Sequence, residues 1–157
     1  PARIIAKFNS LTEEKIIQAL YRASQAGVEI DLIVRGICCL KPGVPGLSEN
    51  IRVRSVIGRF LEHTRIYHFH HGGEDLVYGS SADWMDRNLF NRVETCFPIN
   101  DPVLKAQVIE QGLHYYLRDN SRAWLLQPDG RYLRARPEDG EESFIAQHVL
   151  LETLGGS

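Results

Sequence analysis

The sequence has few cysteines, no long apolar run and no excess of charge of either sign. Its three cysteines are an odd number, and Cys38 and Cys39 are adjacent, so we expect no disulfide framework. No apolar run approaches the roughly 18 residues that indicate a membrane-spanning helix. The formal net charge is −2, whereas a protein that binds DNA non-specifically would have an excess of Lys and Arg. We therefore expect a cytoplasmic protein that does not bind nucleic acid.

The length of the chain and its basic residues give further expectations about domain organisation and ligands. A chain of 157 residues corresponds to about one domain, which can bury a full core without a metal or a disulfide. The chain begins with Pro1 rather than Met, so we expect it to be one domain of a longer chain. Fourteen of the 18 basic residues are Arg, whose planar guanidinium suits phosphate and carboxylate groups. A general compositional bias would give the same excess and is the simpler explanation.

The first part of the chain predicts a strand, a helix and a second strand. Arg3–Phe8 alternates weakly, as a short strand does, and Val28–Val34 is a β-branched run typical of a buried strand. Between them, Ser10 and Glu13 have the spacing of a capping box, and apolar residues at helical spacing continue to Gly27. This order favours two parallel strands joined by a right-handed crossover.

The middle of the chain predicts a long loop and further strands. Residues Arg35–Asn50 are rich in Gly and Pro and indicate a loop of a length that is usually functional or mobile. Three elements are expected after it: a strand over 51–57, a short helical turn over 57–62, and a hairpin whose strands Arg65–His70 and Leu76–Tyr78 flank Gly72-Gly73.

The last part of the chain predicts one more strand and two helices. The strand is expected over Leu89–Phe97, and a helix begins at Asn100 or Asp101 with Pro102 in its first turn. A final helix is expected over Ser143–Leu154. The residues between the two helices are polar and poorly periodic, and they predict no regular element. Together these patterns indicate an α/β domain.

Residues that could handle phosphate flank the predicted hairpin. His63 and Arg65 are two positions apart, and on an extended segment both side chains would lie on one face. An imidazole can attack phosphorus or move a proton near neutral pH, while a guanidinium holds phosphate oxygens. Ser80 and Ser81 add hydroxyl groups and accessible backbone amides. We therefore regard His63 and Arg65 as candidates, although a histidine taken alone is more often structural.

Arg35 is a second candidate because of its position. It follows the predicted strand Val28–Val34, and ligands of parallel sheets bind beyond the carboxyl ends of the strands. An arginine there is a candidate phosphate ligand. The alternative is a surface arginine paired with a carboxylate.

Three histidines near the predicted hairpin could suggest a metal site. They are His68, His70 and His71. Zinc requires three or four converging ligands, and the sequence has no Cys-x-x-Cys or His-Glu-x-x-His pattern. We expect packed or solvated strand histidines and no metal site.

Two motifs resemble the signature of the phospholipase D superfamily, which is His-x-Lys, then Asp, then Gly-Ser-x-Asn. His63-Thr64-Arg65 is similar to the first part, with Arg in place of Lys. Ser80-Ser81-Ala82-Asp83-Trp84 is similar to the last part, with Ser for Gly and Asp83 for Asn. These substitutions depart from the phosphodiesterase pattern.

Four segments, in order, resemble the C-terminal domain of bacterial polyphosphate kinases. They are Val34–Cys38, Leu47–Arg52, Phe60–Tyr67 and the segment from Ser80 through Met85 to Arg87 and Asn88. The resemblance covers nearly the whole chain, most firmly from Ile4 to Ile99. It implies a phospholipase-D-like domain with a mixed, mainly parallel central sheet flanked by helices. It also implies that residues 1–157 are a single C-terminal catalytic domain, excised from a longer multidomain chain.

The resemblance implies a function and roles for individual residues. Polyphosphate kinases reversibly transfer the terminal phosphate of ATP to a growing polyphosphate chain through a phosphohistidine. Arg35 and His63 match family residues that contact the nucleotide, and His63 would be the catalytic residue here, as a general acid/base or a phosphate stabiliser. The supporting residues would be Arg65, Ser80, Ser81 and Asp83. The phosphorylated histidine and the ligands of the Mg²⁺ that accompanies ATP or ADP would lie in preceding domains, so no metal ligand is expected in this chain.

The resemblance also implies partners, and two other functions remain open. The expected partners are ATP or ADP, inorganic polyphosphate and the N-terminal domains of the same enzyme, in a homo-oligomer for which peripheral membrane association is open. The isolated chain is expected to be inactive as a kinase. One alternative is a phospholipase-D-like phosphodiesterase or nuclease half-site that works as a homodimer. The other is a non-catalytic polyanion-binding module in which His63 is structural.

Overall fold

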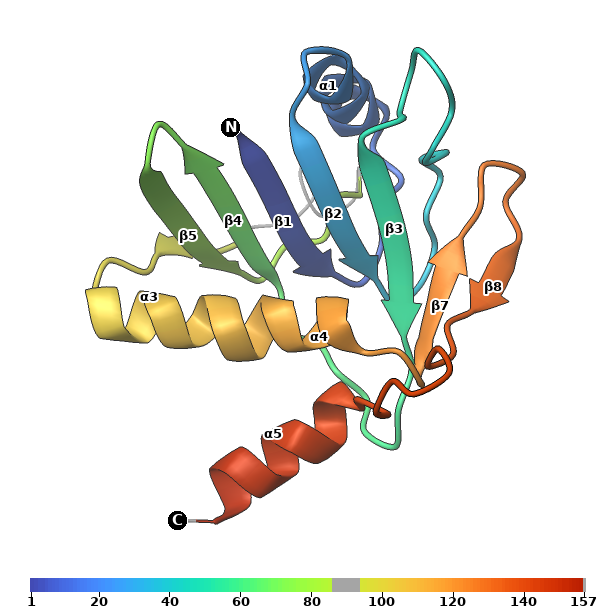
Figure 1. Cartoon of the computed structure of the whole chain (residues 1–157). Coiled ribbons are helices and arrows are strands. Elements are labelled where there is room, and N and C mark those ends of the chain that lie inside the picture. Colours follow the sequence, from blue (N-terminus) through green and yellow to red (C-terminus); the bar gives the residue numbers. More distant parts are fainter. Residues whose placement is uncertain (86–93, 157) are drawn as a thin grey trace.

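An eight-stranded sheet organises the chain, with helices packed against it (Figure 1). The computed structural model describes residues 1–85 and 94–156. In chain order the elements are β1 Arg3–Phe8, α1 Glu14–Gln25, β2 Glu29–Val34, β3 Ile51–Val56, β4 Ile66–His71, β5 Glu74–Ser80, β6 Cys96–Pro98, α3 Pro102–Ile109, α4 Tyr115–Arg118, β7 Ala123–Leu126, β8 Tyr132–Arg134 and α5 Ala146–Gly155. A π-helical turn, Glu110–His114, joins α3 to α4. No helix in this part of the chain is long and apolar enough to cross a membrane.

The sheet is mixed, with a parallel centre. Its order is β6-β5-β4-β1-β2-β3-β7-β8. Within the described sheet only β1–β2 and β2–β3 pair in parallel, and every other pairing is antiparallel. The prediction of a mixed sheet flanked by helices is therefore confirmed, but "mainly parallel" is right only for these three central strands. Because β4 and β5 form a hairpin and β7 and β8 another, both flanks must add antiparallel strands.

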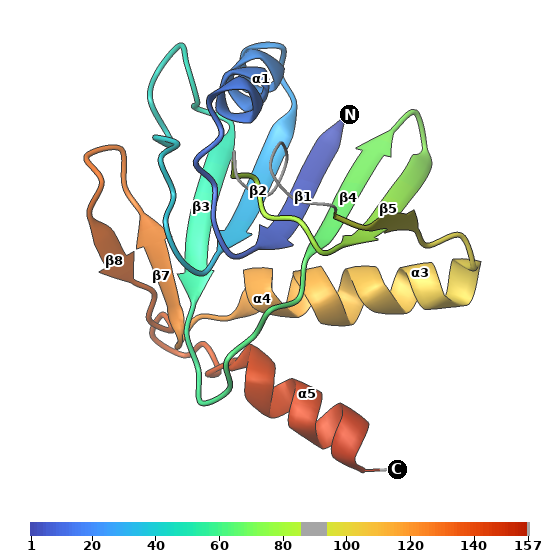
Figure 2. The ribbon, with the colours of Figure 1, turned by 180° about the vertical axis from the view of Figure 1, so that it is seen from behind.

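The two faces of the sheet carry separate cores, as the alternation of strand side chains requires. On β1, Ala6 and Phe8 belong to one core and Ile5 to the other. The first core includes Ile17 and Leu20 of α1. The second includes residues from the α3–α4 segment and from α5, which pack against the other face (Figures 1 and 2).

The start of α1 corrects one prediction. The residue that caps the helix is Glu13, whose side chain accepts a hydrogen bond from Ile16 N at 2.7 Å, so Ser10 is not the cap. The chain before the helix is held by its backbone instead: Leu11 N donates to Ile37 O at 2.8 Å, and Thr12 N donates to Trp84 O at 2.8 Å. These bonds join three distant segments beside the carboxyl ends of β1 and β2.

Other local predictions have mixed outcomes. The hairpin, the strand at 51–56, the helix beginning at Asp101–Pro102 and a C-terminal helix are confirmed. The predicted helical turn at 57–62 is wrong, because that segment is irregular. For the strand predicted over Leu89–Phe97, Leu89 to Val93 lie outside the described residues, as do Arg87 and Asn88 of the fourth motif, and β6 covers Cys96–Pro98.

Strands β7 and β8 were not predicted. They form a hairpin around a Pro128-Asp129-Gly130 turn, in which Gly130 has a φ of 87°. Gln127 N donates to Arg131 O at 2.8 Å across this turn. Pro, Asp and Gly in this order are a turn signal, so a hairpin could have been inferred here.

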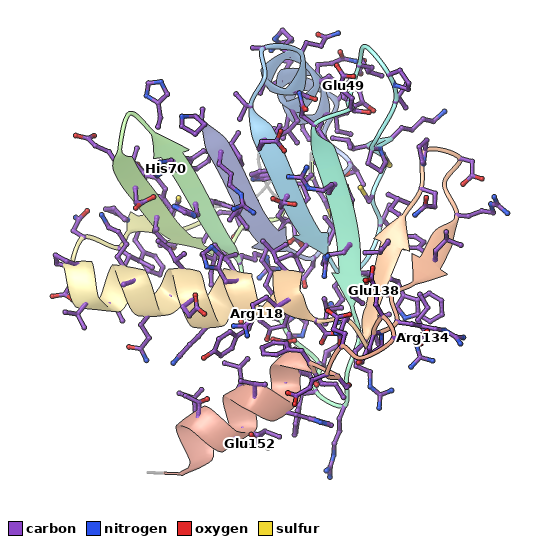
Figure 3. The ribbon with its side chains drawn as sticks, viewed as in Figure 1. Glu49, His70, Arg118, Arg134, Glu138 and Glu152 are labelled. Carbon is purple, nitrogen blue, oxygen red and sulfur yellow. The ribbon has the colours of Figure 1, made fainter. Side chains whose placement is uncertain are left out.

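The segment after α4 is fixed by a buried carboxylate. Asp119 accepts hydrogen bonds from three backbone amides, those of Ser121 at 3.0 Å, Arg122 at 2.7 Å and Ala146 at 2.9 Å. Nearby, the guanidinium of Arg118 lies 4.4 Å from the ring centre of Phe144, between the end of α4 and the chain leading to α5 (Figure 3). These contacts fix where α5 begins on the second core.

Candidate functional site

The candidate site lies at the carboxyl ends of the three parallel strands. Asn9 follows β1, Arg35 follows β2, and an irregular segment, residues 57–65, follows β3 and leads to β4 (Figure 1). This edge is where parallel sheets bind ligands, because the loops that leave neighbouring strands converge there. The sequence-based placement of Arg35 at the end of a parallel strand agrees with this arrangement.

Arg35 is held in place by β1 and β3. Its backbone N donates to Phe8 O at 3.3 Å, and its Nε donates to Asn9 Oδ1 at 3.2 Å. Its carbonyl oxygen accepts a hydrogen bond from Ser55 Oγ at 3.2 Å. Arg35 forms no ion pair with a carboxylate of the described residues. The described contacts therefore do not support the alternative of a surface arginine paired with a carboxylate.

A cavity of about 320 Å³ opens beside Arg35. It is lined by Arg35 and by seven consecutive residues from the end of β3 onward, Val56 to Glu62. His63 follows directly in the chain and is exposed. The structure thus brings Arg35 to the segment that carries His63.

Glu62 anchors this segment to the second core. Its Oε1 accepts a hydrogen bond from the hydroxyl of Tyr116 in α4, and its Oε2 accepts one from Gln147 Nε2 in α5 at 3.0 Å. Lys7 Nζ of β1 lies 3.6 Å from Glu62 Oε1. Gln147 also binds the backbone of Phe60, accepting from its N at 3.1 Å and donating to its O at 2.9 Å. Three elements therefore fix the chain just before His63.

Lys7 is a buried cation beneath the site. Its side chain is 8% exposed, and Nζ lies 4.6 Å from the ring centre of Tyr116. Burial lowers the pKa of Lys7 below its ordinary value, with a smaller contribution in the same direction from Arg35, while Glu62 opposes the shift. Burial likewise raises the pKa of Tyr116, helped by the neighbouring Glu62 carboxylate. The hydroxyl of Tyr116 therefore stays protonated and donates to Glu62.

His63 and Arg65 are not placed as two side chains of one strand. Strand β4 begins at Ile66, so both residues precede it. Arg65 Nη1 donates to the backbone oxygen of His63 at 3.2 Å, which fixes the main chain and leaves the imidazole exposed. Strand alternation therefore does not apply to these two residues, and their joint contact with one phosphate stays a prediction.

Arg65 and Asp83 bind each other. Arg65 Nε and Nη2 donate to the two carboxylate oxygens of Asp83 at 2.9 and 3.3 Å, and Asn9 N donates to Asp83 Oδ1 at 2.8 Å. The hydrogen bond to Asp83 raises the pKa of Arg65, so the guanidinium stays charged. This bidentate pair ties the start of β4 to the segment after β5 and to the end of β1. A role of either residue in binding phosphate stays a prediction.

Ser80 and Ser81 use their hydroxyls within the turn that follows β5. Ser80 Oγ accepts a hydrogen bond from Ala82 N at 3.0 Å, and Ser81 Oγ accepts one from Thr95 N at 2.8 Å. Trp84 packs in the core next to them, with its ring centre 4.5 Å from that of Phe8. The structure places the two serines near Asp83 in the chain, and their role toward phosphate stays a prediction.

The strand histidines gather around one carboxylate on the hairpin (Figure 3 labels His70). His68 Nε2 and His70 Nδ1 each lie 2.7 Å from Asp75 Oδ1. Hydrogen bonds from the two imidazoles lower the pKa of Asp75. His68 and His70 lie on β4 and Asp75 on β5, and Lys105 Nζ donates to Asp75 O at 2.9 Å. The three groups have ligand atoms within 4.8 Å of one another, as a metal site requires, so the absence of a metal here stays a prediction.

The carboxylates of Glu62 and Asp83 near Arg35 already have partners within the chain. Magnesium prefers carboxylate and phosphate oxygens. Glu62 is engaged by Tyr116, Gln147 and Lys7, and Asp83 is engaged by Arg65. A metal that accompanies a nucleotide would therefore need its protein ligands elsewhere.

Comparison with known proteins places the chain in a family. A family model described as polyphosphate kinase C-terminal domain 2 matches residues 1–147. The chain belongs to this family. It is 60% identical over 154 residues to a polyphosphate kinase of Pseudomonas putida, a match that covers 98% of this chain and 21% of that protein. This polyphosphate kinase domain thus spans about a fifth of the length of that relative.

Solved structures agree with the family and with the fold. The crystal structure of polyphosphate kinase from Porphyromonas gingivalis matches with a TM-score of 0.93 at 46% identity, over 99% of this chain and 24% of that chain. Nuc from Salmonella typhimurium, a phospholipase D family member, matches with a TM-score of 0.54 at 19% identity, over 85% of this chain and 82% of that chain. The second match concerns the fold alone, and the predicted phospholipase-D-like fold is confirmed.

Sequence reasoning missed the anchoring residues of this polyphosphate kinase domain. Lys7, Tyr116 and Gln147 come from three distant parts of the chain, and nothing in their local sequence indicates that they meet at Glu62. The only local signal is Glu62 itself, a charged residue directly before a candidate histidine.

Proposed function

We propose that this chain is the part of a polyphosphate kinase that binds phosphate groups through Arg35 and His63. The complete enzyme would reversibly transfer the terminal phosphate of ATP to polyphosphate. The observation that carries the proposal is Arg35, which forms no ion pair among the described residues and lines a cavity beside the segment that presents His63. A guanidinium with no carboxylate partner at the carboxyl ends of parallel strands suits an anionic ligand.

Arg35 and His63 would have different roles in phosphoryl transfer. Phosphoryl transfer spreads negative charge over the equatorial oxygens, so a fixed guanidinium at Arg35 stabilises the transferring group. The exposed imidazole of His63 can donate a proton to, or accept one from, an oxygen of that group. Neither residue completes the reaction alone, because the histidine that is phosphorylated and the ligands of Mg²⁺ would come from preceding domains. The isolated chain would therefore bind phosphate groups weakly and would lack kinase activity.

The proposed binding partners are those that this reaction requires. They are ATP or ADP, inorganic polyphosphate and the preceding domains of the same enzyme, and we propose a cytoplasmic homo-oligomer for the complete protein. This domain and a preceding domain of the enzyme would meet across a cleft. Water would be excluded from the cleft, because water there would hydrolyse ATP.

A titration of this chain tests the phosphate-binding role. Mg²⁺-ADP and a medium-length polyphosphate would be added separately while NMR follows the ring of His63 and the side chain of Arg35. Saturable shifts at both residues, weakened by added salt, are expected because the contacts are charged. Shifts absent from both residues while others respond would contradict the proposal. Hydrolysis of a chromogenic phosphodiester by a homodimer of the chain would favour the phosphodiesterase alternative instead.

A further inference from the structure

The arginines of the chain differ in whether a carboxylate already holds them. Ion pairs with Asp or Glu are formed by Arg3, Arg52, Arg65, Arg118 and Arg131. Arg59, like Arg35, forms no such pair with any described residue. Both residues line the same cavity of about 320 Å³. Two of the residues that line this cavity are therefore arginines that form no ion pair with a described carboxylate.

The backbone that carries Arg59 is clamped on both sides. Before it, Ile57 N donates to Arg122 O at 3.1 Å. After it, both backbone polar groups of Phe60 bind the side chain of Gln147. The guanidinium carbon of Arg59 lies 5.7 Å from the ring centre of Phe60, within the range of a cation–π contact. Arg59 is exposed, yet its main chain is fixed beside the cavity.

The charge of the cavity suits an anion. Glu62 is the one carboxylate among the described residues that line it. Its oxygens are engaged by Tyr116 and Gln147, and Lys7 is its counter-charge at 3.6 Å. The cavity volume falls at the lower end of the roughly 300–1,000 Å³ of ordinary ligand sites, which suits a short run of phosphate groups. Two planar guanidinium groups can each hold the oxygens of one phosphate.

We propose that Arg59 binds phosphate groups together with Arg35 in this cavity. The inference rests on the proposed function and adds a second binding side chain to it. The shared ligand chemistry is a run of linked phosphates, which either a polyphosphate chain or the phosphate groups of a nucleotide supplies.

Steady-state kinetics of the complete polyphosphate kinase test the role of Arg59. The reaction would be followed in both directions, with KM measured separately for polyphosphate and for the nucleotide. Arg59→Ala should raise one KM by about tenfold to a hundredfold, the loss expected when one charge-assisted contact is removed. Arg59→Lys keeps the charge but not the planar fork, and its KM should lie between those of the unaltered enzyme and Arg59→Ala. The KM that rises identifies the source of the phosphates.

A matched control and a companion variant make the outcomes distinguishable. Arg22→Ala removes an exposed arginine on α1, outside the cavity, and should leave both KM values unchanged. Arg59→Ala kinetics equal to those of Arg22→Ala would overturn the inference, as would a fall in kcat with both KM values unchanged. If Arg35→Ala still disables the enzyme in that case, the proposed function stands without Arg59. If Arg35→Ala and His63→Ala both leave turnover intact, the proposed function itself fails.

Discussion

Replacing Glu62 with Gln should destabilise the chain by removing the counter-charge of Lys7. The substitution keeps the size of the side chain, and its amide oxygen can still accept a hydrogen bond from Tyr116. Its NH2 group replaces the oxygen that accepts from Gln147 Nε2, so that hydrogen bond is lost as well. It leaves a lysine with an 8% exposed side chain without the carboxylate that lies 3.6 Å away. Breaking a buried ion pair on one side typically costs about 3–5 kcal/mol. Because the pKa of Lys7 is already lowered, the lysine can release its proton, and we expect a smaller loss of about 2 kcal/mol.

Urea unfolding measures this loss. With an m-value of roughly 2 kcal/mol/M, the midpoint of unfolding should fall by about 1 M. The double variant Lys7→Met with Glu62→Gln should recover the part of the loss that comes from the unpaired charge of Lys7, because it removes both charges. Glu49→Gln is the matched control, since Glu49 is exposed on the loop before β3 (Figure 3). An unfolding midpoint for Glu62→Gln equal to that of Glu49→Gln, or a double variant weaker than both single variants, would refute the reasoning.

Three further predictions concern the titration of Lys7 and the carboxylates of Asp83 and Asp119. Burial lowers the pKa of Lys7 in the folded chain. At pH values between this lowered pKa and the usual pKa of lysine, the unfolded chain therefore binds more protons than the folded chain. The free energy of unfolding relative to Lys7→Met should therefore rise with pH in that window, and urea titrations at several alkaline pH values that show a fall would contradict this. Asp83→Asn leaves Arg65 without its charge partner and should cost about 3 kcal/mol in thermal or urea unfolding, whereas a change below about 0.5 kcal/mol would show that the pair contributes little. Asp119→Ala removes the acceptor of three backbone hydrogen bonds and should cost about 3 kcal/mol or more, with early loss of protection of the Ala146 amide in hydrogen exchange; unchanged protection would be the opposing result.

The parts of the fold that the sequence predicts are those with strong local patterns. The strand Arg3–Phe8, the helix after it and the buried run that ends at Val34 are each specified by neighbouring residues. Gly72-Gly73 indicates the hairpin because both residues adopt positive φ, at 60° and 82°. For these elements periodicity and turn chemistry agree with the tertiary structure.

The parts that were missed depend on contacts between distant residues. Strand β7 has only four residues and β8 three, so neither shows a clear period. The direction of the flanking strands depends on hairpin closure and was therefore not evident from the central crossover. A capping box at Ser10 was expected, but Leu11 and Thr12 instead join Ile37 and Trp84.

In the candidate site, too, local sequence predicts some residues, and others depend on contacts between distant residues. Arg35 could be placed because the end of a buried strand is visible in the sequence. The surroundings of His63 could not be predicted, since they depend on contacts of Glu62 with distant residues. Tyr116 is 54 residues away in the chain and Gln147 is 85 residues away. Arg65 is a candidate phosphate ligand by its sequence position, and its pairing with Asp83 is visible only in the structure.

We propose that Arg35 and His63 form the phosphate-binding part of a polyphosphate kinase active site. The most direct test is ATP-dependent polyphosphate synthesis by the complete enzyme carrying His63→Ala, with folding checked by thermal unfolding. His63 is exposed and its side chain has no described hydrogen bond, so the variant should fold normally and lose nearly all synthesis. A normally folded variant that still makes polyphosphate at the unaltered rate would contradict the claim and would favour a non-catalytic polyanion-binding module.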